Sequence, residues 1–191
     1  MPDEDRKKWN SKYSQQDAVS SAPSTLLVQL DDLLPRLGKT LDVAGGAGRH
    51  AVWLAQRGLD VTLADVSQAG LDIAKERAIA ADVKVDALLV DLESESFPAG
   101  PWDLIVSIHY LWRPLFQVFP AVLAPGGMLV FSQPTQSNLQ RYKKPSARFL
   151  LRDEELPKLV QGLEIVHYEE GWLVEGRHEA LLVARRPNEV L

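Results

Sequence analysis

The sequence predicts an α/β fold: a Rossmann-like, doubly wound, seven-stranded sheet, mostly parallel with an antiparallel last strand. Short apolar runs alternate with segments of helical period, which is typical of βαβ units. The first unit carries a glycine-rich turn at residues 45–48. Asp42, Asp65 and Asp91 stand at the ends of three successive apolar runs. Because the carboxyl ends of parallel strands meet at one edge, we expect these carboxylates to share a ligand site.

Size and composition fit one globular domain. The chain has 191 residues, of which 46% are hydrophobic and 25% charged. No apolar run approaches the ~18 residues needed to cross a bilayer. The first residues contain no apolar segment of a secretory signal. We therefore expect a cytoplasmic protein without a membrane partner, with an N-terminal segment at 1–23 and a single domain at 24–191.

Several classes of site and partner are disfavoured. The absence of cysteine excludes disulfides and cysteine zinc sites. The four histidines lack the H-E-x-x-H spacing, so no metal site is predicted. A net charge of -5 argues against a protein whose main role is to hold a nucleic-acid backbone. We expect a small-molecule acceptor, no nucleic acid, and a monomer or homodimer.

The first βαβ unit carries the most specific signal. A buried strand ending at 43 leads through the glycines to a helix from 49, which Gly58 ends, and a second strand finishes in Asp65. The turn has almost no side chains, so a ligand can lie against its backbone. An acidic residue about 20 residues past the glycines is placed to accept hydrogen bonds from a ribose.

Two adenosine ligands fit this turn. Residues 46–51 satisfy the G-x-G-x-x-G/A pattern of dinucleotide sites. Asp42 decides between the ligands, because a carboxylate at the end of the first strand would repel a pyrophosphate at the helix N-terminus. The same carboxylate suits S-adenosylmethionine, which carries a sulfonium and an ammonium group and no phosphate. S-adenosylmethionine is therefore the favoured cofactor.

The remaining elements follow in order. Residues 1–23 are polar and form either a tail or a lid. Leucines at 26, 27, 30, 33, 34 and 37 predict a helix with all six in the core. Helices are expected near 67–78, 114–123 and 154–160, and strands near 83–90, 101–107, 128–131, 163–168 and 180–184. The short link through Gly171 and Gly176 indicates an antiparallel hairpin at the end of the chain.

The pattern Asp42-x-Ala44-x-Gly46-x-Gly48, followed by Asp65 and Asp91-Leu92, resembles the cofactor motifs of class I S-adenosylmethionine-dependent methyltransferases. Within that class it is most similar to small bacterial enzymes of the tellurite-resistance type, and the resemblance covers about 41–186. Ala44 departs from the family, which usually has glycine there. The resemblance implies in-line methyl transfer, with Asp91 accepting from the adenine amino group and Leu92 packing on the ring.

The residues expected at the cofactor come from the strand ends, the turn and a lid. Trp9-x-x-Lys12-Tyr13 resembles lid segments of related enzymes that lie over the cofactor. The predicted cofactor-binding residues are Asp42, Ala44, Gly45, Gly46, Gly48, Arg49, His50, Asp65, Val66, Asp91, Leu92, Ser107, Trp9 and Tyr13.

The catalytic candidates follow the fourth strand. The sulfonium is already activated, so the protein mainly positions the acceptor. His109 is the best-placed candidate base, with Tyr110 beside it, and the alternative is that His109 only packs. His50 is expected to be structural or to touch the cofactor, and His167 to pack. His178, with Arg177, falls on the terminal hairpin, where it can reach a substrate.

A basic segment indicates the acceptor. Arg141, Lys143, Lys144, Arg148 and Arg152 follow the fifth strand without an intervening acidic residue. Such a cluster attracts a small anion, and the alternative is a solvated loop. The predicted substrate-binding residues are Arg113, Arg141, Arg148 and Arg177. An oxyanion or a carboxylate-bearing acceptor fits best, and a chalcogen oxyanion would need no base.

Three functions remain open from the sequence. The favoured one is an S-adenosylmethionine-dependent methyltransferase acting on a small, anionic acceptor. The others are a nicotinamide-dependent oxidoreductase, which reads the same turn, and a non-catalytic S-adenosylmethionine-binding protein.

Overall fold

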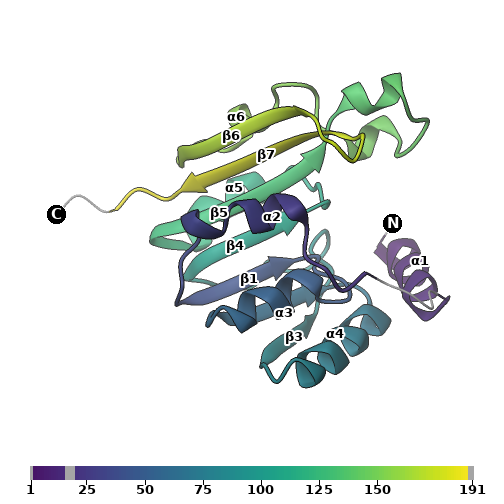
Figure 1. The fold of residues 1–191 in the computed structure, drawn as a ribbon, viewed down its shortest axis with the longest axis vertical. Coiled ribbons are helices and arrows are strands. Elements are labelled where there is room, and N and C mark those ends of the chain that lie inside the picture. Colours follow the sequence, from purple (N-terminus) through teal and green to yellow (C-terminus); the bar gives the residue numbers. More distant parts are fainter. Residues whose placement is uncertain (1, 16–19, 189–191) are drawn as a thin grey trace.

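The computed structural model describes residues 2–15 and 20–188. Its centre is a seven-stranded sheet of order β3-β2-β1-β4-β5-β7-β6 (Figure 1). Neighbours among the first five strands pair in parallel, and β7 is antiparallel to both β5 and β6, which confirms the predicted fold class. The strands are β1 (Lys39–Val43), β2 (Asp60–Asp65), β3 (Val85–Leu89), β4 (Trp102–Ile108), β5 (Leu123–Pro134), β6 (Glu164–Trp172) and β7 (His178–Arg185).

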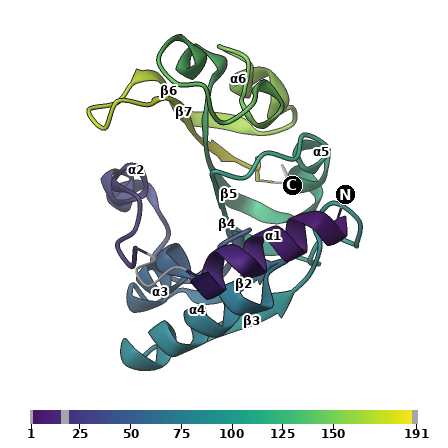
Figure 2. The same cartoon turned by 90° about the vertical axis from the view of Figure 1, so that its right-hand side faces the viewer.

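Helices cover both faces of the sheet. One face packs against α2, α3 and α4, and the other against α5 and α6 (Figures 1 and 2). The helices are α1 (Pro2–Gln15), α2 (Thr25–Gln29), α3 (Arg49–Gln56), α4 (Gln68–Ala80), α5 (Leu115–Val122) and α6 (Leu156–Leu159). Single 3-10 turns add η1 (Asp31–Leu33), η2 (Gln136–Gln140) and η3 (Ala147–Phe149).

Each face has its own apolar core. Leu27, Leu54 and Leu71 bring α2, α3 and α4 onto the first face. Phe119 and Leu156 bring α5 and α6 onto the second. The central strand β4 is therefore buried on both sides, as a near-continuous apolar run predicts.

The predicted leucine helix is shorter than its pattern. Leucines 26, 27, 30 and 34 are buried, but Leu33 is 43% exposed and Leu37 is 77% exposed, so the prediction that all six lie in the core is wrong. The α-helix ends at Gln29 and continues as the turn η1. Pro35 disfavours helical backbone at the residue before it, and the chain then turns toward β1.

The terminal hairpin is confirmed, with β6 and β7 antiparallel. However, β7 lies between β5 and β6, which leaves β6 at the edge. The burial of the strands explains this order, because residues 179–184 are buried throughout, while β6 is half-exposed along its length. An apolar run needs neighbours on both sides, and the charged strand tolerates the edge.

The carboxyl ends of the parallel strands lie on one side of the molecule. Figure 1 shows α1 and the segment that follows β5 on that side, and Figure 2 shows α1 lying across it. Among the described residues, every helix is too short or too polar to cross a membrane.

Candidate functional site

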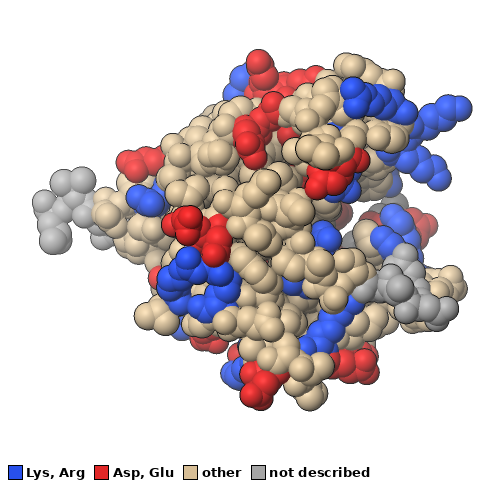
Figure 3. Space-filling model, viewed as in Figure 1, with Lys and Arg blue, Asp and Glu red and all other residues tan. Residues whose placement is uncertain are grey.

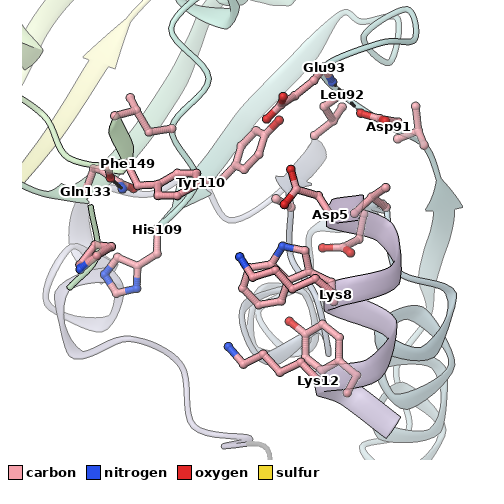
Figure 4. Close-up of a pocket in the computed structure, with 18 of the residues that line it drawn as sticks. Asp5, Lys8, Lys12, Asp91, Leu92, Glu93, His109, Tyr110, Gln133 and Phe149 are labelled. Carbon is pink, nitrogen blue, oxygen red and sulfur yellow. Dashed lines mark hydrogen bonds between the residues drawn. The ribbon is translucent and has the colours of Figure 1, made fainter. Parts of the chain in front are cut away.

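A cavity of about 430 Å³ opens at the carboxyl ends of the strands. Figure 4 shows His109 and Gln133 on one side of it and α1, with Lys8 and Lys12, on the other. Nine of the residues predicted for the site line this cavity: Trp9, Tyr13, Ala44, Asp65, Val66, Asp91, Leu92, His109 and Tyr110. Side chains far apart in the sequence therefore meet at the edge that the topology favours for a ligand.

The glycine-rich turn follows β1 with a backbone that few side chains tolerate. Gly46 and Gly48 have φ of 56° and 76°. A Cβ on Gly48 would lie 2.6 Å from the Cβ of Ala74, so α4 packs directly against the turn. Ala44 adopts φ of 53°, a conformation that favours glycine and costs an L-residue roughly 1–2 kcal/mol. The turn therefore retains its backbone conformation with alanine at this position, and the Ala44 side chain lines the cavity.

Asp65 ends β2 and connects the turn to α4. Its Oδ2 accepts from the amide of Gly46 and its Oδ1 from the amide of Ser67, both at 2.8 Å. Burial raises the pKa of this carboxyl, and the amides of Ser67, Gly46 and Val66 partly offset the rise. Each carboxylate oxygen has further acceptor capacity, so Asp65 can also accept from a ligand in the cavity.

Asp42 lies beneath the turn and is 1% exposed. Within the described part of the chain, neither of its oxygens has a hydrogen-bond partner. Burial and the charge of Asp65 raise the pKa of Asp42 to about 7, against smaller opposing effects of the Ala51 amide and Arg49. An unpartnered buried carboxylate is costly to the fold, and a cation in the neighbouring cavity would relieve that cost.

His109 follows β4 and is held from two sides. Its φ is 64°, and its amide donates to the carbonyl of Ser132 on β5 at 2.9 Å. Its Nε2 lies 2.7 Å from Oε1 of Glu179 on β7. Histidine is among the residues that adopt this left-handed backbone more readily. The result is an imidazole that lines the cavity with 28% of its side chain exposed.

Glu179 was not predicted from the sequence. It is 2% exposed, also accepts a hydrogen bond from the Ser132 hydroxyl, and lies 3.6 Å from Nε of Arg177. Burial alone would raise the pKa of Glu179, but His109, Ser132 and Arg177 outweigh it and hold the pKa below its ordinary value. The available signal was an acidic residue directly before the buried run at 180–184.

Residues 2–15 of the N-terminal segment form the helix α1, which lies over the cavity. Trp9 and Tyr13 stack with ring centroids 6.0 Å apart, and the Tyr13 hydroxyl lies against Gly46. Asn10 attaches the helix to the start of α4, where its Oδ1 accepts from the Ser67 hydroxyl at 2.8 Å. Burial, followed by the charge of Asp65, raises the pKa of Tyr13 to about 12. Tyr13 is therefore a neutral hydrogen-bonding group at the turn.

At the end of the cavity away from His109, the lining comes from residues that follow β2 and β3. Val66, Asp91 and Leu92 line this end. The Oδ1 atom of Asp91 accepts from the amide of Glu93 at 3.0 Å, so this side chain also caps its own turn. Figure 4 shows Asp91 and Leu92 at the end of the cavity away from His109.

Other predicted cofactor residues lie around this wall without lining the cavity. His50 is buried, and burial, with the charges of Arg49 and His109, lowers its pKa to about 3. The buried hydroxyl of Ser107 donates to the carbonyl of Tyr110 at 3.4 Å. The members of this group are Asp42, Gly45, Gly46, Gly48, Arg49, His50 and Ser107.

The four arginines predicted to bind substrate are absent from the cavity lining. Arg113 binds both oxygens of Glu155, each at 2.8 Å. Arg141 stacks on Trp172 with its guanidinium carbon 3.6 Å from the ring centroid. Arg148 stacks on Phe149 and Arg177 faces Glu179. Figure 3 shows basic side chains gathered on the surface at the corner where Figure 1 draws the segment after β5.

We expect Arg113→Ala to destabilise the protein. The hydrogen bonds from Arg113 help to hold the pKa of Glu155 at about 2. Glu155 is only 5% exposed, so removal of the arginine leaves its carboxylate with fewer hydrogen-bond donors. Breaking such a pair costs roughly 3–5 kcal/mol when it is buried, and less here because Arg113 is partly exposed. Urea denaturation measures the loss. Arg36→Ala, which breaks an exposed pair with Asp31, is the control and should change stability by less than about 1 kcal/mol.

The remaining histidines lie away from the cavity. His167 on β6 is 3.9 Å from Glu169, and Nδ1 of His178 is 2.8 Å from the Thr135 hydroxyl. His178 also approaches carboxylates of Asp153 and Glu170, with candidate ligand atoms within 4.8 Å of one another. Asp153 accepts from the Ser137 hydroxyl, and Glu170 from the hydroxyl of Tyr168. Hydrogen bonds within the protein therefore account for this cluster.

Comparisons with known proteins agree with this geometry. Residues 40–127 match the methyltransferase domain family. The tRNA 5-carboxymethoxyuridine methyltransferase of Escherichia coli strain K12 is 33% identical over 112 residues, 52% of this chain and 43% of the relative. The putative methyltransferase YqeM of Bacillus subtilis is 26% identical over 149 residues, 70% of this chain and 60% of that protein. The chain thus spans less than half the length of the E. coli relative.

A solved structure shows the same fold across almost the whole chain. TehB from Haemophilus influenzae superposes with a TM-score of 0.73 and 19% identity, covering 93% of this chain and 67% of that one. The matched region, residues 40–127, includes the glycine turn, Asp65 and Asp91, which carry the sequence motifs. The chain therefore resembles methyltransferases over residues 40–127 and shares the fold of TehB over most of its length.

Proposed function

We propose that this protein transfers a methyl group from S-adenosylmethionine to a small acceptor bearing an anionic group. Two carboxylates beside the glycine turn carry the proposal. Asp42 is buried without a hydrogen-bond partner, and Asp65 holds the turn and lines the cavity. When bound, the sulfonium supplies an activated methyl group, so the protein's task is to bind and orient.

The charge of the cavity supports a cationic cofactor. Four acidic residues line it (Asp5, Asp65, Asp91 and Glu93), against two lysines. A site of this sign attracts the sulfonium and ammonium groups and repels a pyrophosphate. Asp65 is the proposed ribose acceptor, with Val66, Asp91 and Leu92 at the adenine. Among the non-lining residues, Gly45, Gly46 and Gly48 form the turn, Arg49 and His50 begin α3 after it, and Ser107 lies opposite Val43 of β1.

The acceptor is proposed to enter from the side of Gln133 and Phe149, next to His109. Lys8 and Lys12 of α1 line the same cavity and supply positive charge there. These lysines are proposed as contacts for an anionic group, in addition to the four arginines predicted from the sequence. Apolar groups of Leu111 and Pro134 complete this part of the wall, which suits an acceptor with an apolar body.

Calorimetry and turnover test the proposal in two steps. S-adenosylhomocysteine should bind the wild-type protein with a stoichiometry of about one, whereas NADH should produce no heat of binding. The same protein should then release S-adenosylhomocysteine when it is offered a panel of phenols, carboxylates, thiols, oxyanions and unmodified tRNA. Binding without turnover on any of them would favour a non-catalytic binding protein, and absence of binding would reject the proposal.

We further propose that α1 is a lid over the bound cofactor, with residues 1–23 separable in role from the domain at 24–191. Lys8 supports closure, because its Nζ lies 5.8 Å from the ring centroid of Phe149 across the cavity. Trp9→Ala should raise the dissociation rate of S-adenosylhomocysteine about tenfold, which is about 1.4 kcal/mol. Displacement of radiolabelled ligand measures this rate. Lys7→Ala, on an exposed position of α1, is the control, and equal rates for both variants would reject a lid.

A further inference from the structure

The hydrogen bonds around His109 define which of its nitrogens can accept a proton. Oε1 of Glu179 meets Nε2 of His109 at 2.7 Å and also accepts from the Ser132 hydroxyl. The low pKa of Glu179 keeps it ionised, and an ionised carboxylate only accepts hydrogen bonds. Nε2 must therefore carry a hydrogen. In the described part of the chain no hydrogen bond is made by Nδ1, which leaves that atom available as an acceptor.

The backbone places this imidazole where a reacting group can reach it. His109 has a left-handed conformation at the end of β4, and its amide is fixed to Ser132 at 2.9 Å. Such conformations persist only where the surroundings impose them, and they cluster at functional sites. Here the surroundings are two strands, β5 and β7, that hold the ring against the cavity.

We propose that Glu179 is a positioning residue that holds His109 as the Nε2–H tautomer, so that Nδ1 removes the proton from a hydroxyl-bearing acceptor. This inference rests on the proposed methyltransferase function and narrows its substrate class. A base matters only when the nucleophile arrives protonated, which excludes a chalcogen oxyanion as the preferred acceptor. The ring-lined wall with Tyr110 and Phe149 favours an aromatic hydroxyl compound.

The step balances without another reactant. The acceptor oxygen forms a bond to the methyl carbon while the carbon–sulfur bond of the cofactor breaks and its electron pair stays on sulfur. The acceptor proton moves to Nδ1 of His109 and afterwards leaves to water. Glu179 stays ionised throughout and stabilises the imidazolium that forms, which is the role of the carboxylate in a serine-protease triad.

The first test needs no cofactor and no acceptor. Nitrogen-15 NMR of histidine-labelled protein should show His109 with a protonated Nε2 and an unprotonated Nδ1. Glu179→Gln removes the charge with little change in shape, and should mix the two tautomers. Glu169→Gln, beside His167 at the sheet edge, is the matched control and should leave the His109 signals unchanged. A protonated Nδ1 in the wild type, or identical His109 signals in Glu179→Gln, would overturn the proposal.

The second test compares two acceptors of one shape. 4-Hydroxybenzoate reacts through a protonated hydroxyl, and 4-mercaptobenzoate arrives largely as a thiolate. His109→Ala should lower kcat for the hydroxyl compound about 10²–10⁴-fold, with partial rescue by imidazole, and change the thiol reaction by less than about threefold. Glu179→Gln should lower the hydroxyl rate by about tenfold or more. Equal effects on both compounds, or wild-type turnover of neither, would overturn the assignment. Calorimetric binding of S-adenosylhomocysteine reports separately on the proposed function.

Discussion

Asp65→Ala should weaken the binding of S-adenosylhomocysteine by about 10²–10⁴-fold. In the proposed complex, this carboxylate accepts from the ribose hydroxyls, and a hydrogen bond to a charged group contributes about 1.5–3 kcal/mol. Its loss also releases the amides of Gly46 and Ser67, which Asp65 holds at 2.8 Å, so the turn loses one of its connections to α4. Both effects reduce affinity in the same direction.

Calorimetry at one ionic strength measures the change. Asp60→Ala is the matched control, because Asp60 lies at the other, exposed end of the same strand. That variant should bind within about twofold of the wild type. An Asp65→Ala protein that is folded, by circular dichroism, and still binds within threefold would contradict the ribose role.

Asp42→Asn should make the protein more stable and at the same time a weaker cofactor binder. The folded-state pKa of about 7 lies above the ordinary value of 3.8. Between these values the folded state binds more protons than the unfolded state, so the free energy of unfolding falls as the pH rises from about 4 to about 7. Asparagine cannot ionise, so the variant avoids this loss, which is on the order of 2–4 kcal/mol.

Urea denaturation at pH 4 and pH 8 tests the stability effect. The difference between Asp42→Asn and the wild type should be small at pH 4 and largest at pH 8. At pH 8 the affinity for S-adenosylmethionine should fall about 10–100-fold, because a neutral amide does not attract the cationic groups. Near pH 7 the wild type should release a proton on binding, seen as buffer-dependent heats, and the variant should not. A stability difference that is independent of pH would contradict the account.

The fold could be predicted because its signals are local and repeated. Apolar runs that end in Asp42 and Asp65, with glycines between them, specify a βαβ unit almost by themselves. The terminal hairpin could be predicted because the link between its two strands is too short for a helical crossover. The leucine helix was overestimated because period alone does not show where the chain must turn, and Leu37 fits the period while facing solvent.

The site likewise contains residues that the sequence predicts and residues that depend on tertiary packing. Ala44, Asp65 and Asp91 of the motifs reach the cavity wall because strand order brings consecutive strand ends together. Glu179 and Lys8 carry no motif, and their places depend on how the last strand inserts and where α1 lies. The contacts of the arginines could not be foreseen for a related reason. Charge counted along the sequence does not show that Arg113 is held by Glu155, which lies 42 residues away.

A crystal structure of the complex with S-adenosylhomocysteine tests the central claim most directly. The account predicts ribose hydroxyls on the carboxylate of Asp65, the adenine between Val66 and Leu92, and the amino acid portion along the turn toward Asp42. Density for a diphosphate over Gly46 and Gly48 on soaking with NADH, or a turn that stays sealed beneath Tyr13 with no ligand bound, would contradict it.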